Sequence, residues 1–171
     1  MAAADDGAEL SAGTFVIHAL PVAGGILAIA PLPGRGGRYR DDLAHICDWR
    51  PALVLSLTTE AELKASGAQD IGAHLQDSGT RWAHLPVGDY AHPEPEVEEA
   101  WHGTSRSALA ALQGGGRVLI HCKGGCGRSG MAALRLMVEA GEDADAALER
   151  LRAVRPCAVE TDAQLQWALK G

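Results

Sequence analysis

One short segment holds most of the residues that could do chemistry. HCKGGCGRSG, residues 121–130, places Cys122 six positions before Arg128, with three glycines between them. Glycines allow a tight loop whose backbone N–H groups all turn inward, and such a concave set of donors binds a tetrahedral anion. A helix that begins directly after the loop adds the partial positive charge of its N-terminus at the same point. The spacing therefore predicts an oxyanion-binding loop that contains a cysteine.

Cys122 and Arg128 suit the two halves of a phosphoryl transfer. The positive field of the loop favours the thiolate form of Cys122, which is the nucleophilic form at neutral pH. Arg128 offers a planar fork for two phosphoryl oxygens, a geometry that lysine lacks. Its charge would hold the equatorial oxygens of a phosphoryl group during transfer. The pair predicts nucleophilic catalysis on a phosphate ester.

The elements around this loop indicate an α/β fold. RVLIH, residues 117–121, is a short apolar run bounded by glycines, as a buried central strand would be, and a helical pattern follows the loop to about Glu139. Further strands are expected at 14–19, 25–30, 52–57 and 81–85, and further helices at 41–50, after Thr58 or Thr59, and at 70–76, 96–112, 144–154 and 161–169. The first two strands form a hairpin-like pair around a Pro/Gly turn at 21–25, and Asp41 and Asp42 are expected to cap the helix that follows them.

This alternation predicts a central, mostly parallel sheet of about five strands with helices on both faces. In such a fold, function is expected at the carboxyl ends of the strands, where residues 121–130 begin.

Residues 121–129 read His-Cys-x5-Arg-Ser, which resembles the signature of the Cys-based protein tyrosine phosphatase superfamily, and the small size is similar to its dual-specificity branch. That branch places a general-acid Asp upstream of the nucleophile on a mobile loop. Asp89, in LPVGD, matches it and precedes Cys122 by 33 positions. Downstream, RPCAVETDAQ resembles the branch's segment of Arg-Pro, a short spacer and a Gln, here Gln164. PLPG at 31–34 and VLSL at 54–57 resemble the kinase-associated subgroup, so the matching elements span residues 30 to 169.

The resemblance implies a two-step hydrolysis with a phosphocysteine intermediate. Cys122 attacks the phosphorus and Asp89 protonates the leaving oxygen; the ionised Asp89 then deprotonates the water that breaks the intermediate. Ser129 would hydrogen-bond the departing thiolate, His121 would orient the loop from the buried side, and Gln164 would position the water. Glu94 is the alternative acid.

The resemblance also implies which residues bind the phosphate, and that the reaction needs neither a metal nor a cofactor. The binding residues would be Lys123, Gly124, Gly125, Cys126, Gly127 and Arg128.

The substrate expected first is a phosphorylated protein, at phosphotyrosine and then at phosphoserine or phosphothreonine. An inositol phosphate or phosphoinositide is the alternative, because some lipid-directed members have Lys where this chain has Lys123, and because Arg35, Arg38 and Arg40 follow PLPG. Two further candidate functions are a non-catalytic phosphoprotein-binding module and a rhodanese-like sulfurtransferase.

Cys126 lies four positions from Cys122 and has two interpretations. It either fills space in the loop or forms a disulfide with Cys122, which would protect the nucleophile from overoxidation and switch the enzyme off. His121, Cys122 and Cys126 lack the second ligand pair of a zinc finger, so we do not expect a metal site.

Composition limits the remaining classes. The 171 residues suit one domain, and 15 Lys plus Arg against 22 Asp plus Glu give a net charge of -7, which argues against a general nucleic-acid binder. Four cysteines are too few for a disulfide-dense secreted module, so a reducing compartment is expected.

The beginning of the chain carries no recognisable targeting signal. MAAADDGAEL has acidic residues where a secretory signal has basic ones, so residues 1–12 are expected to be a disordered lead before a single domain at 13–171. Residues 10–34 are uncharged apart from their histidine, but their prolines and glycines favour strands over a membrane span. A cytoplasmic location is therefore expected, and the sequence leaves the oligomeric state open.

Overall fold

The computed structural model describes residues 14–171, and these contain one five-stranded sheet. Its strands are β1 (His18–Val22), β2 (Gly25–Ala30), β3 (Leu53–Ser56), β4 (Arg81–His84) and β5 (Arg117–His121), in the order β1-β2-β5-β3-β4. Only β1 runs antiparallel to its neighbour; the β2–β5, β5–β3 and β3–β4 pairs are parallel. The mostly parallel sheet expected from the sequence is confirmed, with β5 at its centre.

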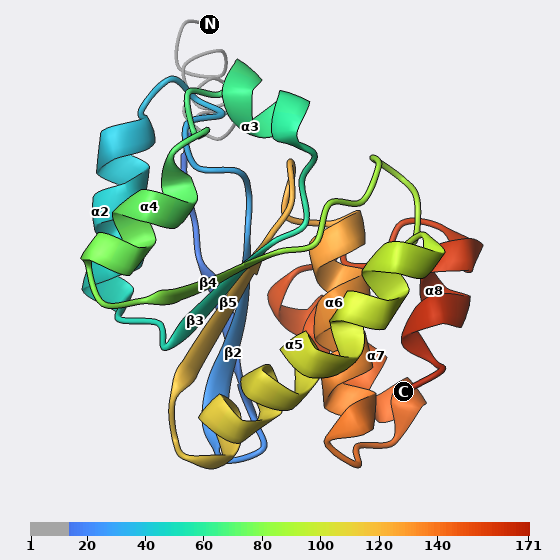
Figure 1. Cartoon of the computed structure of the whole chain (residues 1–171). Coiled ribbons are helices and arrows are strands. Elements are labelled where there is room, and N and C mark those ends of the chain that lie inside the picture. Colours follow the sequence, from blue (N-terminus) through green and yellow to red (C-terminus); the bar gives the residue numbers. More distant parts are fainter. Residues whose placement is uncertain (1–13) are drawn as a thin grey trace, which may run out of the picture.

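Helices cover both faces of the sheet (Figure 1). On one side lie α2 (Tyr39–Trp49), α3 (Glu60–Ala65) and α4 (Ile71–Asp77); on the other lie α5 (Pro95–Gln113), α6 (Gly127–Glu139), α7 (Ala144–Val154) and α8 (Asp162–Ala168). Parallel strands need crossover connections, and here helices supply them. The sheet therefore separates two hydrophobic cores.

The central strand shows why its sequence is apolar without interruption. Successive side chains of a strand point to opposite faces. Val118 and Ile120 of β5 join the core under α5–α8, whereas Leu119 joins the core under α2–α4. Because both faces are covered, every position from 118 to 121 is buried. The next loop begins at the carboxyl end of this central strand.

Two local expectations about the first elements are wrong. The turn of the hairpin is Ala23-Gly24, both with positive φ, and Pro21 lies inside β1, opposite Ile26. Pro21 is tolerated because β1 is an edge strand, where a missing N–H costs no ladder hydrogen bond. Asp42 does not cap α2: its carboxylate accepts a 2.9 Å hydrogen bond from the Gly34 N–H.

The first strand was expected at 14–19, but β1 begins four residues later, at His18, and ends at Val22. The remaining boundaries differ from the expected ones by one or two residues, as at α5 and β4. Thr59 begins α3 through a reciprocal capping box with Glu62, as a Thr-x-x-Glu pattern predicts. The expected lead at 1–12 lies outside the described residues. Within residues 14–171, none of the helices combines the length and the apolar character needed to span a bilayer.

Candidate active site

The segment that follows β5 forms a tight loop between the sheet and α6. β5 ends at His121, and α6 begins at Gly127 with Cys126 as its N-cap. Gly125 has a φ of 71°, and a Cβ atom there would lie 2.8 Å from the backbone carbon of Ala30. Gly125 is therefore required both for its left-handed backbone and for close packing against the end of β2. The strand, glycine loop and helix expected from the sequence occur in this order.

Cys122 lies at the point where the chain leaves the sheet. Cys122 is 2% exposed, and its Sγ lies 3.2 Å from the Oγ of Ser129 in the first turn of α6. A hydroxyl can donate to a thiolate but is also an ordinary partner for a thiol. Ser129 therefore lies against Cys122, as the resemblance implies.

His121 is part of a hydrogen-bond chain behind the loop. Trp82 donates to Ser56 Oγ (2.8 Å), which lies 2.5 Å from His121 Nε2. His121 Nδ1 lies 3.2 Å from the carbonyl oxygen of Cys122. Complete burial lowers the pKa of His121 to about 4, so the ring is neutral at pH 7. Nδ1 then donates to the carbonyl and Nε2 accepts from Ser56, which fixes the backbone of Cys122.

Arg128 is held from several sides. Its Nη1 and Nη2 donate to the two carboxylate oxygens of Glu62 at 2.7 and 2.8 Å, and Nη1 also donates to the carbonyl oxygen of Val87 at 2.8 Å. The residue is 1% exposed. Its Nε is a buried donor without a hydrogen-bond partner in the described residues. A buried unpaired N–H is costly, and a bound oxyanion would satisfy it.

The Glu62–Arg128 pair keeps both groups ionised. Hydrogen bonds from Arg128 lower the pKa of Glu62 to about 2, against the opposing effect of burial. Burial lowers the pKa of Arg128, but the hydrogen bonds to Glu62 outweigh it and the net shift is upward. The charge of Arg128 is therefore permanent, and its orientation is set by a bidentate carboxylate.

Asp89 lies on the segment between β4 and α5 and reaches the same arginine. Its Oδ1 is 3.3 Å from Nη2 of Arg128, and its side chain is 45% exposed. The same oxygen accepts from the N–H of Tyr90. Glu94 is the N-cap residue of α5, and no hydrogen bond or ion pair in the described residues joins its side chain to Arg128. The structure thus places Asp89, rather than Glu94, beside Arg128.

The side-chain amide of Gln164 forms hydrogen bonds with the backbone at two places. Its Oε1 accepts from the N–H groups of Glu160 and Thr161, and its Nε2 donates to the carbonyl oxygen of Ala91, two residues after Asp89. Gln164 is completely buried. Its amide therefore joins the start of α8 to the segment that carries Asp89.

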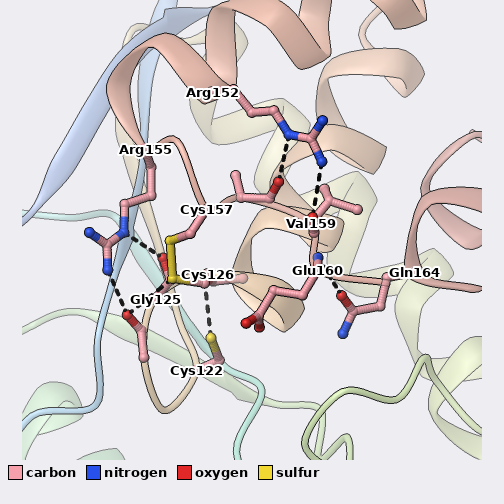
Figure 2. The surroundings of a disulfide bond; sticks show 12 residues. Cys122, Gly125, Cys126, Arg152, Arg155, Cys157, Val159, Glu160 and Gln164 are labelled. Carbon is pink, nitrogen blue, oxygen red and sulfur yellow. Dashed lines mark hydrogen bonds between the residues drawn. A yellow bond between two sulfur atoms is a disulfide. The ribbon is translucent and has the colours of Figure 1, made fainter. Parts of the chain in front are cut away.

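Glu160, for which the sequence predicts no role, lies over the start of α6. A Cβ atom placed on Gly127 would lie 2.3 Å from Glu160 Oε1 and 2.9 Å from Gln164 Oε1. Figure 2 shows the Glu160 and Gln164 side chains on the same side of the loop. Gly127 is thus needed to let these two polar side chains approach the loop.

Cys126 forms a disulfide with Cys157, in the connection between α7 and α8 (Figure 2). Cys122 and Cys47 are free. The sequence-based hypothesis of a Cys122–Cys126 disulfide is therefore not the pairing that the structure contains. The sequence could not show this pairing, because Cys157 lies 31 positions downstream and only the packing of the α7–α8 connection against the loop brings it near.

The connection after α7 contacts the loop at further points. Arg155 donates to the carbonyl oxygens of Gly124 and Gly125 at 2.9 and 3.1 Å, and the N–H of Val159 donates to the carbonyl oxygen of Cys126. Lys123 is exposed at the start of the loop. Residues 14–171 contain no group of three or more His, Cys, Asp or Glu side chains placed to bind a metal ion.

Comparison with protein families gives a match over residues 33–167. The matching model describes the DSP-PTPase phosphatase domain of Swiss Army Knife proteins, and it covers every residue of the site. The chain belongs to this phosphatase family. A comparison of this chain with curated protein sequences found no match.

Solved structures of phosphatases share the fold. Kinase associated phosphatase, in a form with its catalytic cysteine replaced by serine, has a TM-score of 0.77 and 21% identity over 90% of this chain and 92% of its own. Tk-PTP in its active form has a TM-score of 0.67 and 28% identity over 90% and 94%. PTPMT1 in complex with PI(5)P has a TM-score of 0.70 and 16% identity over 90% and 93%.

Sequence reasoning missed Glu62 as part of the site. The Thr-x-x-Glu pattern predicts only that Glu62 caps the start of a helix, and Glu62 does complete the capping box of α3. Its contact with Arg128 joins residues 66 positions apart, and no pattern in the sequence connects them. The structure shows that one carboxylate serves as both a helix cap and an arginine anchor.

Proposed function

We propose that this phosphatase domain hydrolyses phosphomonoesters through a phosphocysteine on Cys122, with phosphotyrosine in proteins as the first substrate class and phosphoserine or phosphothreonine as the second. The observation that supports this most directly is the unpaired, buried Nε of Arg128. The other two nitrogens of the guanidinium are bound to Glu62, so the arginine is oriented before any substrate arrives. Preorganised donors of this kind stabilise charge in a transition state at no further cost of reorganisation.

In the proposed first step, a phosphoryl group lies in the loop 122–128, and the backbone N–H groups of Lys123, Gly124, Gly125, Cys126 and Gly127 surround its oxygens with Arg128. The Cys122 thiolate attacks the phosphorus, and the bond between phosphorus and the ester oxygen breaks. Asp89 gives its proton to that oxygen. The contact between Asp89 and Arg128 supports this role, because it holds the carboxyl group beside the side chain that would bind the phosphate.

In the proposed second step, Asp89 takes a proton from a water molecule that attacks the phosphocysteine. The Ser129 hydroxyl, 3.2 Å from Cys122 Sγ, donates to the departing thiolate. For Gln164 the contacts support a positioning role: through Ala91 it fixes the backbone beyond Asp89, and through Glu160 and Thr161 it fixes the segment over Gly127. His121 orients Cys122 and stays neutral throughout.

A second candidate function is hydrolysis of an inositol phosphate or phosphoinositide. The supporting observations are exposed Lys123 at the edge of the loop and exposed Arg35 near Gly124, which add positive charge in a protein of net charge -7. PTPMT1, which shares the fold, has been solved with PI(5)P. The family assignment leaves no support for a sulfurtransferase.

The cytoplasmic location is an expectation from the lack of a recognisable targeting signal or membrane span, and the small number of cysteines adds the expectation of a reducing compartment. The Cys126–Cys157 disulfide argues in the other direction, because such bonds persist mainly in oxidising compartments. Cell fractionation of the native protein, with thiol labelling of Cys157, tests both points together.

The proposed function is tested by hydrolysis of an aryl phosphate, phosphopeptides and inositol phosphates, comparing wild type with Cys122→Ser and Asp89→Ala. We expect Cys122→Ser to be inactive and Asp89→Ala to lose most on substrates with poor leaving groups, because protonation matters most there. If the wild type binds a phosphopeptide but hydrolyses nothing, the chain is a phosphoprotein-binding module instead.

A further inference from the structure

Trp82 lies outside the site, yet it begins the hydrogen-bond chain that ends at Cys122. It belongs to β4, the edge strand of the sheet, and it packs against the core under α2–α4. The chain crosses three strands: Trp82 in β4 donates to Ser56 in β3, and Ser56 contacts His121 in β5. Side-chain hydrogen bonds therefore connect the edge of the sheet to the residue that leads into loop 122–128.

Packing fixes the direction of the Trp82 indole. A Cβ atom on Gly72 of α4 would lie 2.4 Å from Cε3 of Trp82, so the absence of a side chain there makes room for the ring. The ring of His84 stacks on the indole with centroids 5.4 Å apart and an interplanar angle of 21°. The indole N–H reaches the Oγ of Ser56, which is completely buried, at 2.8 Å. The indole is held on two sides, with its N–H directed at Ser56.

The groups around His121 leave its ring neutral. Burial is the largest cause that lowers its pKa, to about 4. His84 and Arg128 lower this pKa further by their charge. Glu62 and the hydrogen bond to the Cys122 carbonyl oppose the shift without reversing it. A neutral imidazole has a single N–H, on either Nδ1 or Nε2.

The two ends of the chain favour one direction of donation. The indole N–H can only donate, and the carbonyl oxygen of Cys122 can only accept. Because His121 has one ring proton, all three hydrogen bonds exist together when Ser56 donates to Nε2 and Nδ1 donates to the carbonyl. Every bond of the chain then runs from the sheet edge to the loop.

The indole N–H stabilises this arrangement against the other tautomer. A hydroxyl that already accepts one hydrogen bond donates more strongly and accepts a second one less readily, because chains of hydrogen bonds polarise one another. Without Trp82, Ser56 is a better acceptor for a proton on Nε2 of His121. Nδ1 would then face the Cys122 carbonyl oxygen without a proton, and that hydrogen bond would be lost.

The last bond of the chain fixes the first peptide of loop 122–128. The C=O and N–H of a trans peptide point to opposite sides. The Cys122 carbonyl is held toward His121, so the N–H of Lys123 points away from the ring. The Lys123 carbonyl oxygen in turn accepts from the Leu32 N–H at 3.0 Å. This peptide joins the nucleophile to the first N–H group that the proposed function assigns to the phosphate.

We propose that Trp82 is a positioning residue of the active site: by donating to Ser56 it selects the Nδ1–H tautomer of His121 and thereby fixes the first peptide of loop 122–128. The inference rests on the proposed function and deepens it, because it assigns a residue at the sheet edge to the support of the Cys122 nucleophile. Trp82 acts through Ser56 and His121 and touches none of the reacting atoms.

The test compares Trp82→Phe with Trp49→Phe in the full chain. Both tryptophans are half-buried against the same core. The indole N–H of Trp49 makes no hydrogen bond with any residue from 14 to 171, so its replacement removes the same atoms without breaking a chain. Ser56→Ala, alone and combined with each tryptophan variant, completes a double-mutant cycle. The ring 15N chemical shifts of His121 report which nitrogen carries the proton, and p-nitrophenyl phosphate reports turnover.

We expect Trp82→Phe to move the ring proton of His121 partly to Nε2 and to lower kcat about three- to tenfold, the effect of one hydrogen bond. Trp49→Phe should match wild type in both measurements. Adding Trp82→Phe to Ser56→Ala should lower kcat no further, because the chain is already broken.

Wild-type 15N shifts in Trp82→Phe, or a kcat equal to that of Trp49→Phe, would overturn the positioning role. A wild type that hydrolyses nothing would instead overturn the proposed function, and the 15N comparison would still decide the role of Trp82.

Discussion

The guanidinium of Arg128 is bound along one edge by Glu62 and open at Nε. A free arginine side chain must lose rotamer freedom when it binds phosphate, whereas this one is already ordered. In the proposed mechanism, a glutamate that never touches the substrate thereby contributes to binding and to transition-state stabilisation. Its effect should be visible in catalysis and, separately, in stability.

Replacing Glu62 with glutamine should lower kcat/KM for an aryl phosphate about 10- to 100-fold, because Arg128 loses its bidentate carboxylate and its fixed orientation. Glu60→Gln is the control, since Glu60 lies in the first turn of the same helix and is exposed. Steady-state kinetics measure both variants. Equal values for the two would show that Arg128 is oriented without Glu62.

The same pair predicts a pH dependence of stability. The pKa of Glu62 is lowered from 4.5 to about 2 in the folded protein. Folding therefore gains stability from the ionised carboxylate above pH 4.5 and loses it as the pH falls toward 2. Urea unfolding at pH 6 and pH 3 should show a smaller loss for Glu62→Gln than for wild type. A wild-type loss no larger than that of the variant would contradict the assigned role.

At the scale of elements, the connection between α7 and α8 fixes the loop of residues 122–128 at several points. The Cys126–Cys157 disulfide, the bonds from Arg155 to the loop carbonyls and the Val159–Cys126 backbone bond all come from residues 155–159. Val159 has a φ of 65°, which is costly for a β-branched residue and shows how tightly this segment is constrained. The loop and this connection should therefore respond as one unit.

Cys157→Ser and Cys126→Ser should each destabilise the fold by about 3–4 kcal/mol, the chain-entropy value for a cross-link over such a loop. Both should show the same lower Tm, and kcat should fall because the loop is no longer fixed at Cys126. Cys47→Ser, which removes a free thiol away from the loop, is the matched control. If a thermal melt gave the disulfide variants the Tm of the control, the cross-link would have no structural role.

At the scale of the whole molecule, the sheet architecture and the position of the site could be predicted because they follow from local patterns. The apolar run 117–121, buried on both faces, and the glycines after it are sufficient to place a loop at the end of a central strand. The Glu62–Arg128 pair and the Cys126–Cys157 disulfide could not be predicted. Each joins segments far apart in sequence, and it exists only once both faces of the sheet are packed.

A catalytic acid and a thiolate that must both be in the correct protonation state also predict a bell-shaped dependence of kcat/KM on pH, with its maximum on the mildly acidic side of neutral. Asp89→Ala should remove the basic limb of this curve, because that limb reports the protonated acid. Stopped-flow assays with an aryl phosphate across the pH range measure it. A flat wild-type profile would contradict an acid–thiolate mechanism.

The most direct test of the phosphocysteine mechanism is to trap the intermediate. Wild type, Asp89→Ala and Cys122→Ser are mixed with an aryl phosphate, quenched within milliseconds, digested and mapped by mass spectrometry. We predict a phosphoryl group on Cys122 in wild type and Asp89→Ala, and no labelled residue in Cys122→Ser. Turnover by Cys122→Ser, or a phosphoryl group on another residue of an active enzyme, would contradict the account.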